Sequence, residues 1–183
     1  MRNRLFQPTF VFDLDNTLVE TDRANNLSYK DAITSVLGRD FNWDFKKRFT
    51  RNQLYLCFPN LLPQQYEKVV KTKNDRFNAY MSETKSNNNL FRVLSMLHRY
   101  GCCTILLTNC HRRRALAICN YYGISSLFTE KYFAEDKDGN KYEVLTRKGY
   151  NLRNIVLFEN EAEEAYEAMK HGILQKNIIS VKF

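Results

Sequence analysis

Short apolar segments alternate with amphipathic segments along most of this 183-residue chain. The apolar segments are rich in β-branched and aromatic residues, which is typical of buried strands; they cover residues 9–13, 103–108, 131–134, 154–158 and 177–181. Amphipathic segments that run up to glycines predict helices over residues 90–100, 112–122 and 161–171. This alternation predicts an α/β fold, a doubly wound and mainly parallel sheet with helices on both faces.

Residues 20–86 interrupt the alternation. They contain no convincing strand, and helical patterns cover residues 27–37, 45–58 and 64–81. We therefore expect an α-helical cap over 20–86, inserted into a core formed by 1–19 and 87–183. Residues 20–92 carry 13 basic and 8 acidic side chains, which is more than half of the net charge of +8.

The basic balance favours anionic partners. It does not choose between small phosphorylated molecules and nucleic acid, and the chain has no zinc-finger or aromatic RNP motif to support nucleic acid. No apolar run approaches the roughly 18 residues of a membrane span, so no membrane partner is expected. The first residues lack the pattern of a signal peptide, and the five cysteines include no CxxC pair. The expected compartment is the cytoplasm.

The sharpest chemical signal follows the first strand, in the run Asp13-Leu14-Asp15-Asn16-Thr17-Leu18. Ligands of open α/β sheets bind at the carboxyl ends of strands. Two carboxylates held two residues apart repel each other, and a cation or a shared proton relieves that repulsion. The pair suits one nucleophile and one general acid/base.

The residues from Phe12 to Glu20 resemble motif I, the DxDxT signature, of the haloacid dehalogenase-like (HAD) superfamily. The run LLTN, ending at Asn109, resembles motif II, and Lys141 resembles the lysine of motif III. The run FEN at 158–160 occupies the place of the acidic motif IV. The resemblance covers essentially the whole chain. It implies a Rossmann-like HAD core, with residues 20–86 resembling the family's first cap type.

The resemblance also implies the roles of individual residues. Asp13 would attack phosphorus and form an aspartyl-phosphate, while Asp15 would protonate the leaving oxygen and later activate water. Thr108 and Lys141 would complete the catalytic set around the transferring phosphoryl group. The implied cofactor is Mg²⁺, and its expected ligands are Asp13, Asp15, Glu159 and Asn160. The residues expected to contact substrate are Thr17, Asn109 and Arg112.

Several assignments have alternatives. Thr108 is also a good helix cap at a strand end, and Arg112 could belong to a solvated basic face instead of binding phosphate. Tyr142 follows Lys141 where the family often has proline, and the other lysines that could serve motif III are Lys131, Lys137 and Lys148. Asn160 offers a neutral oxygen where relatives often have a carboxylate. Glu163 and Glu164 could supply the missing charge or form a solvated helix face.

These residues predict a Mg²⁺-dependent phosphatase of a small phosphorylated metabolite, such as a nucleotide or sugar phosphate. A phosphomutase would share every motif. A catalytically weak HAD scaffold that binds an anionic ligand, nucleic acid or a protein partner is the alternative from another class, motivated by Asn160 and the positive charge. A carbon–halogen hydrolase is disfavoured because that branch of the family lacks the second aspartate, here Asp15.

Overall fold

The computed structural model describes residues 8–136 and 139–183 of the chain. These residues form two compact units. The core unit runs up to Val19 and continues from Ser86 to Phe183, and the second unit is the insertion Glu20–Lys85. Lys137, one of the alternative lysines of motif III, lies outside the described residues.

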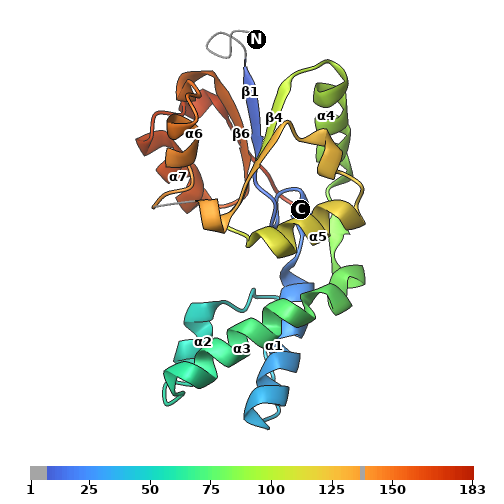
Figure 1. Cartoon of the computed structure of the whole chain (residues 1–183), viewed down its shortest axis with the longest axis vertical. Helices are drawn as coiled ribbons and strands as arrows, with labels where there is room; N and C mark the ends of the chain where they lie inside the picture. The colour runs from blue at the N-terminus through green and yellow to red at the C-terminus, as the bar shows by residue number, and fades with distance from the viewer. Residues whose placement is uncertain (1–7, 137–138) are drawn as a thin grey trace. The chain divides into compact units, whose positions relative to one another are not determined.

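A five-stranded parallel sheet forms the centre of the core unit (Figure 1). Its strand order is β5-β4-β1-β6-β7. The strands are β1 (Thr9–Phe12), β4 (Cys103–Leu107), β5 (Glu130–Tyr132), β6 (Ile155–Glu159) and β7 (Ile178–Ser180). The register pairs Phe12 of β1 with Leu106 on one side and with Phe158 on the other. The residues that follow β1 therefore lie level with the ends of β4 and β6, at one edge of the sheet.

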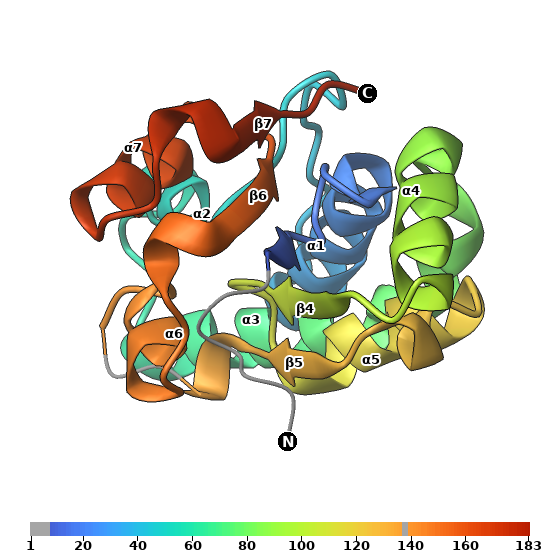
Figure 2. The same ribbon diagram turned by 90° about the horizontal axis from the view of Figure 1, so that it is seen from above.

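Helices cover both faces of this sheet, as Figure 2 shows from above. One face carries α4 (Asn88–Arg99) and α5 (Arg112–Tyr121), and the other carries α6 (Glu143–Arg147) and α7 (Ala162–Lys170). Side chains of β1, β4 and β6 alternate between the two layers. Val11, Ile105 and Leu157 belong to the cluster that includes residues of α6 and α7, whereas Phe12 stacks on Phe158 with ring centroids 4.5 Å apart. The predicted doubly wound α/β fold is confirmed.

The insertion consists of α1 (Asp22–Leu37), α2 (Arg51–Cys57), α3 (Pro63–Arg76) and a 3₁₀ helix over Phe77–Glu83. The unit has its own core, formed by the buried residues Tyr29, Ala32, Ile33, Phe41, Phe49, Leu54 and Val69. A membrane-spanning helix needs roughly 20 residues, and α1 has 16. Among the described residues, none of the helices is both long enough and apolar enough to cross a bilayer.

The helix predicted over residues 45–58 is wrong in its first half, because α2 begins only at Arg51. Two buried asparagines of α1 hold the backbone that precedes α2 in an irregular, non-helical path. The Asn25 side chain donates to the carbonyl of Phe49 at 2.8 Å. The Asn26 side chain donates to the carbonyl of Lys47 and accepts from the amide of Phe49, each at 2.8 Å. These contacts satisfy backbone groups that a helix would otherwise pair internally.

The helix predicted over residues 64–81 also changes along its length. The α-helix ends at Arg76, and the chain continues as the 3₁₀ helix. The insertion is bounded by two short strands that the sequence did not indicate, β2 (Val19–Glu20) and β3 (Lys85–Ser86). They pair with each other, and the core resumes at Ser86. The amide of the next residue, Asn87, donates to the carbonyl of Leu18 at 2.9 Å.

Candidate active site

Asp13 lies at the carboxyl end of the central strand and is buried. Its amide donates to the carbonyl of Phe158 at 3.1 Å, which extends the pairing of β1 with β6 by one residue. The chain then turns tightly, because the carbonyl of Leu14 accepts from the amides of Leu18 and Val19, both at 3.0 Å. Asn16 has the left-handed φ of 59° that this turn requires, a conformation that asparagine tolerates better than most residues. The turn presents both aspartates at the same sheet edge.

Lys141 joins Asp13 to Glu159 in a buried cluster. Its Nζ lies 2.6 Å from Glu159 Oε2 and 3.5 Å from Asp13 Oδ1. The other carboxylate oxygen of Glu159 accepts from the amides of Asn160 and Glu161, at 3.0 and 3.1 Å. Both oxygens of Glu159 are therefore engaged within the protein. Glu159 serves as the partner of Lys141 in this arrangement.

Burial and mutual repulsion shift the protonation equilibria of this cluster. Burial raises the pKa of Asp13 to about 8; Lys141 opposes the shift, and the charges of Glu159 and Asp15 add to it. Burial acts to lower the pKa of Lys141, but Asp13 and Glu159 outweigh it and hold that pKa well above its usual value. Lys141 is therefore a permanent cation beside a carboxyl group that is crowded by negative charge.

The position of Lys141 follows from the packing of the next residue. Tyr142 is fully buried in the cluster that also contains Val144 and Leu145 of α6, so it anchors the start of this short helix. Of the other lysines considered for motif III, Lys148 is exposed at the end of α6 and Lys131 lies in the edge strand β5. Within the described part of the chain, Lys141 is the one that the structure brings to Asp13.

Asp15 is held by Arg114, an arginine that is not among the expected site residues. Arg114 Nη2 donates to Asp15 Oδ2, and its Nε lies 2.8 Å from the sulfur of Cys110. Burial acts to lower the pKa of Arg114, but Asp15 and Cys110 raise it, so the guanidinium stays charged. The sequence does contain a signal: the buried Ile118 follows Arg114 by four residues, which places both on the inner face of α5.

Arg112, the arginine expected to contact substrate, is engaged elsewhere. Its Nη2 donates to Asp136 Oδ1 at 2.7 Å, and its guanidinium lies over the ring of Phe133 at 4.4 Å from the centroid. Its amide donates to the Glu135 carboxylate at 3.0 Å. The structure therefore brings Arg114, and not Arg112, to the paired aspartates.

Thr108 and Asn109 follow β4 at the same edge of the sheet. Thr108 is buried, and its Oγ1 accepts from the amide of Cys110 at 3.1 Å, which leaves its hydroxyl proton free to be donated. The Asn109 side chain donates to Glu164 Oε1 at 2.8 Å. The second oxygen of Glu164 is buried, makes no hydrogen bond, and lies 3.4 Å from Lys141 Nζ. Glu164 thus belongs to the site through Lys141 and Asn109.

Thr17 and Asn160 meet on the side of motif IV. The buried Thr17 donates its hydroxyl proton to Asn160 Oδ1 at 2.9 Å. This contact orients the amide so that its oxygen faces the loop after β1, and the remaining lone pair of that oxygen can accept one further partner.

The oxygen donors of this edge fit Mg²⁺. Mg²⁺ is held in proteins by one or two carboxylates together with waters and substrate oxygens. Asp13 supplies a carboxylate, Asn160 an amide oxygen, and Asp15 could add its backbone carbonyl. Among residues 8–136 and 139–183 no three His, Cys, Asp or Glu side chains form a closed cage. The raised pKa of Asp13 marks a position where a bound cation would relieve charge repulsion.

The profile of the haloacid dehalogenase-like hydrolases matches residues 10–174. No curated protein sequence matches the chain significantly. Among solved structures, CbbY from Rhodobacter sphaeroides in complex with phosphate is 16% identical, with a TM-score of 0.80 over 97% of this chain and 87% of that one.

Two further structures illustrate the range of similar proteins. A candidate β-phosphoglucomutase from Thermotoga maritima is 19% identical, with a TM-score of 0.73 over 97% of this chain and 86% of its own. A haloacid dehalogenase-like hydrolase from Streptococcus pneumoniae is 16% identical, with a TM-score of 0.76 over 95% and 84%. At these identities the likeness is one of fold.

Proposed function

The chain belongs to the haloacid dehalogenase-like hydrolases, and from this premise we propose that it is a Mg²⁺-dependent phosphatase that acts on a small phosphorylated molecule. The observation that carries the proposal is the buried Asp13 with Lys141 at 3.5 Å, beside a second aspartate held by an arginine. The arrangement supplies a nucleophile, a fixed positive charge and a general acid/base. The family, the fold and the donor set support the proposal together.

The proposed reaction has two steps. A carboxylate oxygen of Asp13 attacks phosphorus, the bond from phosphorus to the leaving oxygen breaks, and Asp15 gives its proton to that oxygen. Asp15 then takes a proton from water, whose oxygen attacks the aspartyl-phosphate, releasing inorganic phosphate and regenerating Asp13. Lys141 and the Thr108 hydroxyl stabilise the negative charge of the phosphoryl oxygens. Mg²⁺, held by Asp13, Asn160 and Asp15, would supply further positive charge for the same oxygens.

We also propose that the insertion Glu20–Lys85 acts as a cap that excludes water and helps to select the substrate. Its basic side chains favour a polyanionic substrate. A nucleotide or sugar phosphate is the class we would test first. The proposed compartment remains the cytoplasm.

A substrate panel tests the proposed function. The purified chain is incubated with Mg²⁺ and a set of phosphorylated metabolites together with p-nitrophenyl phosphate, and released phosphate is measured. We expect turnover that requires Mg²⁺. Conversion of a sugar phosphate into its isomer without phosphate release would identify a phosphomutase. No turnover, together with salt-sensitive retention on nucleic acid, would favour a binding scaffold.

Arg114 is predicted to position Asp15 for both proton transfers. A displacement of a catalytic group by about 1 Å can lower a rate roughly 10²-fold, so we expect Arg114→Gln to lower kcat/KM by about that factor. Arg112→Gln is the matched control, because its guanidinium is engaged by Asp136, and it should stay within about threefold of the wild type. Equal losses in the two variants would contradict the role of Arg114.

We predict that Mg²⁺ binds more weakly with Asn160 than it would with a carboxylate at this position, because the amide oxygen is neutral. Asn160→Asp adds a negative ligand while keeping an acceptor for the Thr17 hydroxyl, so we expect Mg²⁺ to bind about tenfold more tightly. Isothermal titration of the substrate-free protein with Mg²⁺ measures this directly, and Asp13→Asn should bind weakly. An unchanged affinity in Asn160→Asp would remove Asn160 from the ligand set.

A further inference from the structure

A cavity of about 470 Å³ lies within the insertion and includes no residue of the candidate active site. Its walls come from three segments: the end of α1 with Arg39, the connection between α2 and α3, and the first turn of α3. The cavity lies at the far end of α1 from Asp22, where the helix begins, and α1 has 16 residues, a length of roughly 24 Å. Small-molecule sites have volumes of about 300–1,000 Å³.

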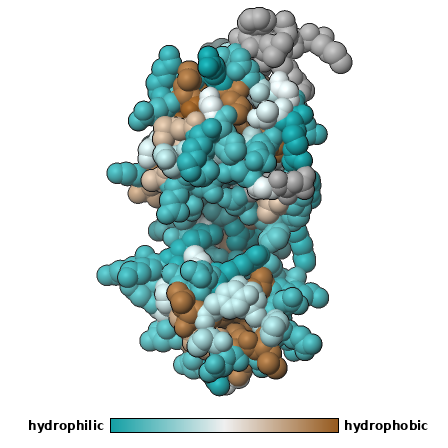
Figure 3. Space-filling model, turned by 90° about the vertical axis from the view of Figure 1, so that its left-hand side faces the viewer, coloured by the Kyte–Doolittle hydropathy of each residue, from teal (hydrophilic) through white to brown (hydrophobic). Residues whose placement is uncertain are grey.

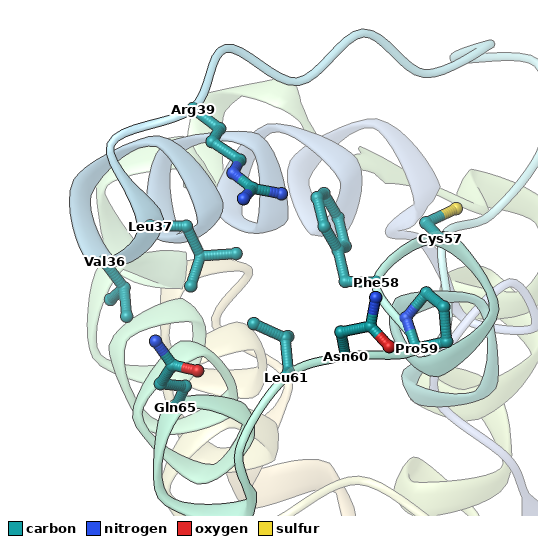
Figure 4. A pocket seen from close by; sticks show the side chains of 9 residues that line it. All are labelled: Val36, Leu37, Arg39, Cys57, Phe58, Pro59, Asn60, Leu61 and Gln65. Carbon is teal, nitrogen blue, oxygen red and sulfur yellow. The ribbon is translucent and has the colours of Figure 1, made fainter.

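The floor of the cavity is apolar and continuous with the core of the unit. Val36, Leu37, Phe58 and Leu61 line it, and all of them also pack against the buried core cluster of the insertion. Figure 4 shows the Leu37 and Leu61 side chains directed into the same space. Figure 3 shows further apolar side chains on the surface of this unit. The polar side chains of Asn60 and Gln65 line the same space, so the cavity combines apolar contacts with polar groups.

The rim of the cavity carries a positive charge that the protein does not neutralise. Within the described residues Arg39 makes no ion pair and no hydrogen bond, and no acidic side chain lines the cavity. The guanidinium of Arg39 points toward the space between Leu37 and Phe58 (Figure 4). A guanidinium presents a fork of donors that matches a carboxylate.

The walls are held in place by helix ends. Gly38 ends α1 in the left-handed conformation with φ 62°, and its amide donates to the carbonyl of Thr34 at 3.0 Å. At the start of α3 the Leu62 amide donates to Gln65 Oε1 at 3.0 Å. These contacts fix the backbone on two sides, so the cavity needs little rearrangement to admit a ligand.

From the apolar floor and the unpaired Arg39 we propose that this cavity binds a small carboxylate with an apolar body, of the size of a medium-chain fatty acid. The carboxylate binds Arg39, and the hydrocarbon chain covers Leu37, Phe58 and Leu61. The site is distinct from the candidate active site, and the proposal does not depend on phosphatase activity.

Octanoate is the probe for this proposal, and the chain provides two reporters. Trp43 is the one tryptophan of the sequence; it stacks on Phe41, which contacts Phe58 at a centroid distance of 5.7 Å. Cys57 is exposed and lines the cavity. We expect octanoate to change Trp43 fluorescence saturably, with one molecule bound per chain, and to slow modification of the Cys57 thiol by a disulfide reagent.

Variants and ligand analogues distinguish the contribution of the Arg39 charge to octanoate binding from the contribution of apolar contacts. Arg39→Gln should weaken octanoate binding about tenfold, whereas Lys68→Gln, which removes an exposed positive charge outside the cavity, should change it less than about twofold. Each methylene removed from the ligand should weaken binding about threefold to fourfold. Circular dichroism checks that both variants keep the helical content of the wild type.

Three results would overturn the proposal. Octylammonium binding as tightly as octanoate would exclude recognition by Arg39. An absence of any saturable change at Trp43 together with unprotected Cys57 would exclude a ligand site. Protection of Cys57 that rises with protein concentration, without octanoate, would show that a second copy of the chain covers this surface.

Discussion

Asp13→Asn is expected to abolish turnover, by about 10⁴-fold or more, and to raise the melting temperature of the metal-free protein. The loss of activity follows because an amide cannot attack phosphorus, and removal of a catalytic nucleophile has effects of this size. The gain in stability follows from burial. The pKa of Asp13 is raised to about 8, so between about pH 4 and 8 the unfolded chain gives up a proton that the folded protein must keep.

The stability difference between Asp13→Asn and the wild type should depend on pH. A carboxyl group whose pKa is higher in the folded state makes the protein less stable as pH rises toward that pKa. Asn carries no such charge, so the advantage of the variant in melting temperature should be small at pH 4 and should grow steadily as the pH rises toward 8. Thermal unfolding is followed in a chelating buffer, with Asp40→Asn on the exposed surface as the control. A variant that keeps turnover within tenfold of the wild type would exclude Asp13 as the nucleophile.

Lys141→Met is expected to destabilise the fold by about 3–5 kcal/mol, because it leaves the buried Glu159 without its cation. The double variant Lys141→Met/Glu159→Gln removes that uncompensated charge, while Gln can still accept from the two backbone amides. It should recover about 2 kcal/mol of stability without recovering activity. Chemical denaturation measures both differences.

Lys148→Met is the control for this series, since Lys148 is exposed at the end of α6 and is one of the alternative lysines of motif III. Its stability should stay within about 0.5 kcal/mol of the wild type, and its turnover should be unchanged. If Lys148→Met lost activity and Lys141→Met did not, the lysine assignment would be reversed.

The core sheet could be predicted because its strands are short apolar runs that end in polar residues. Asp13 after β1, Thr108 after β4 and Glu159 at the end of β6 occupy one edge for that reason, since parallel strands end together. The same logic could not show that Glu159 would be engaged by Lys141. That depends on the burial of Tyr142, which brings residues 18 positions apart into contact.

The contacts that escaped prediction join residues distant in the chain. Arg114 and Asp15 are separated by 99 positions. The sequence alone does not show which of the three consecutive arginines lies on the inner face of α5 and can reach Asp15. The helix predicted over residues 45–58 is wrong over 45–50, where the local apolar pattern alone favours a helix. The buried Asn25 and Asn26, more than 20 positions earlier, decide the path of this backbone instead.

The pairing of β2 with β3 makes the insertion modular. The chain leaves the core at Val19 and re-enters it at Ser86 on neighbouring strands, and the Asn87 amide bonds to the Leu18 carbonyl behind them. The whole segment between can therefore lengthen, shorten or be exchanged without shifting the register of any strand in the parallel sheet. If the insertion selects the substrate as proposed, such a junction lets the insertion be replaced while the arrangement of Asp13 and Lys141 in the core stays unchanged.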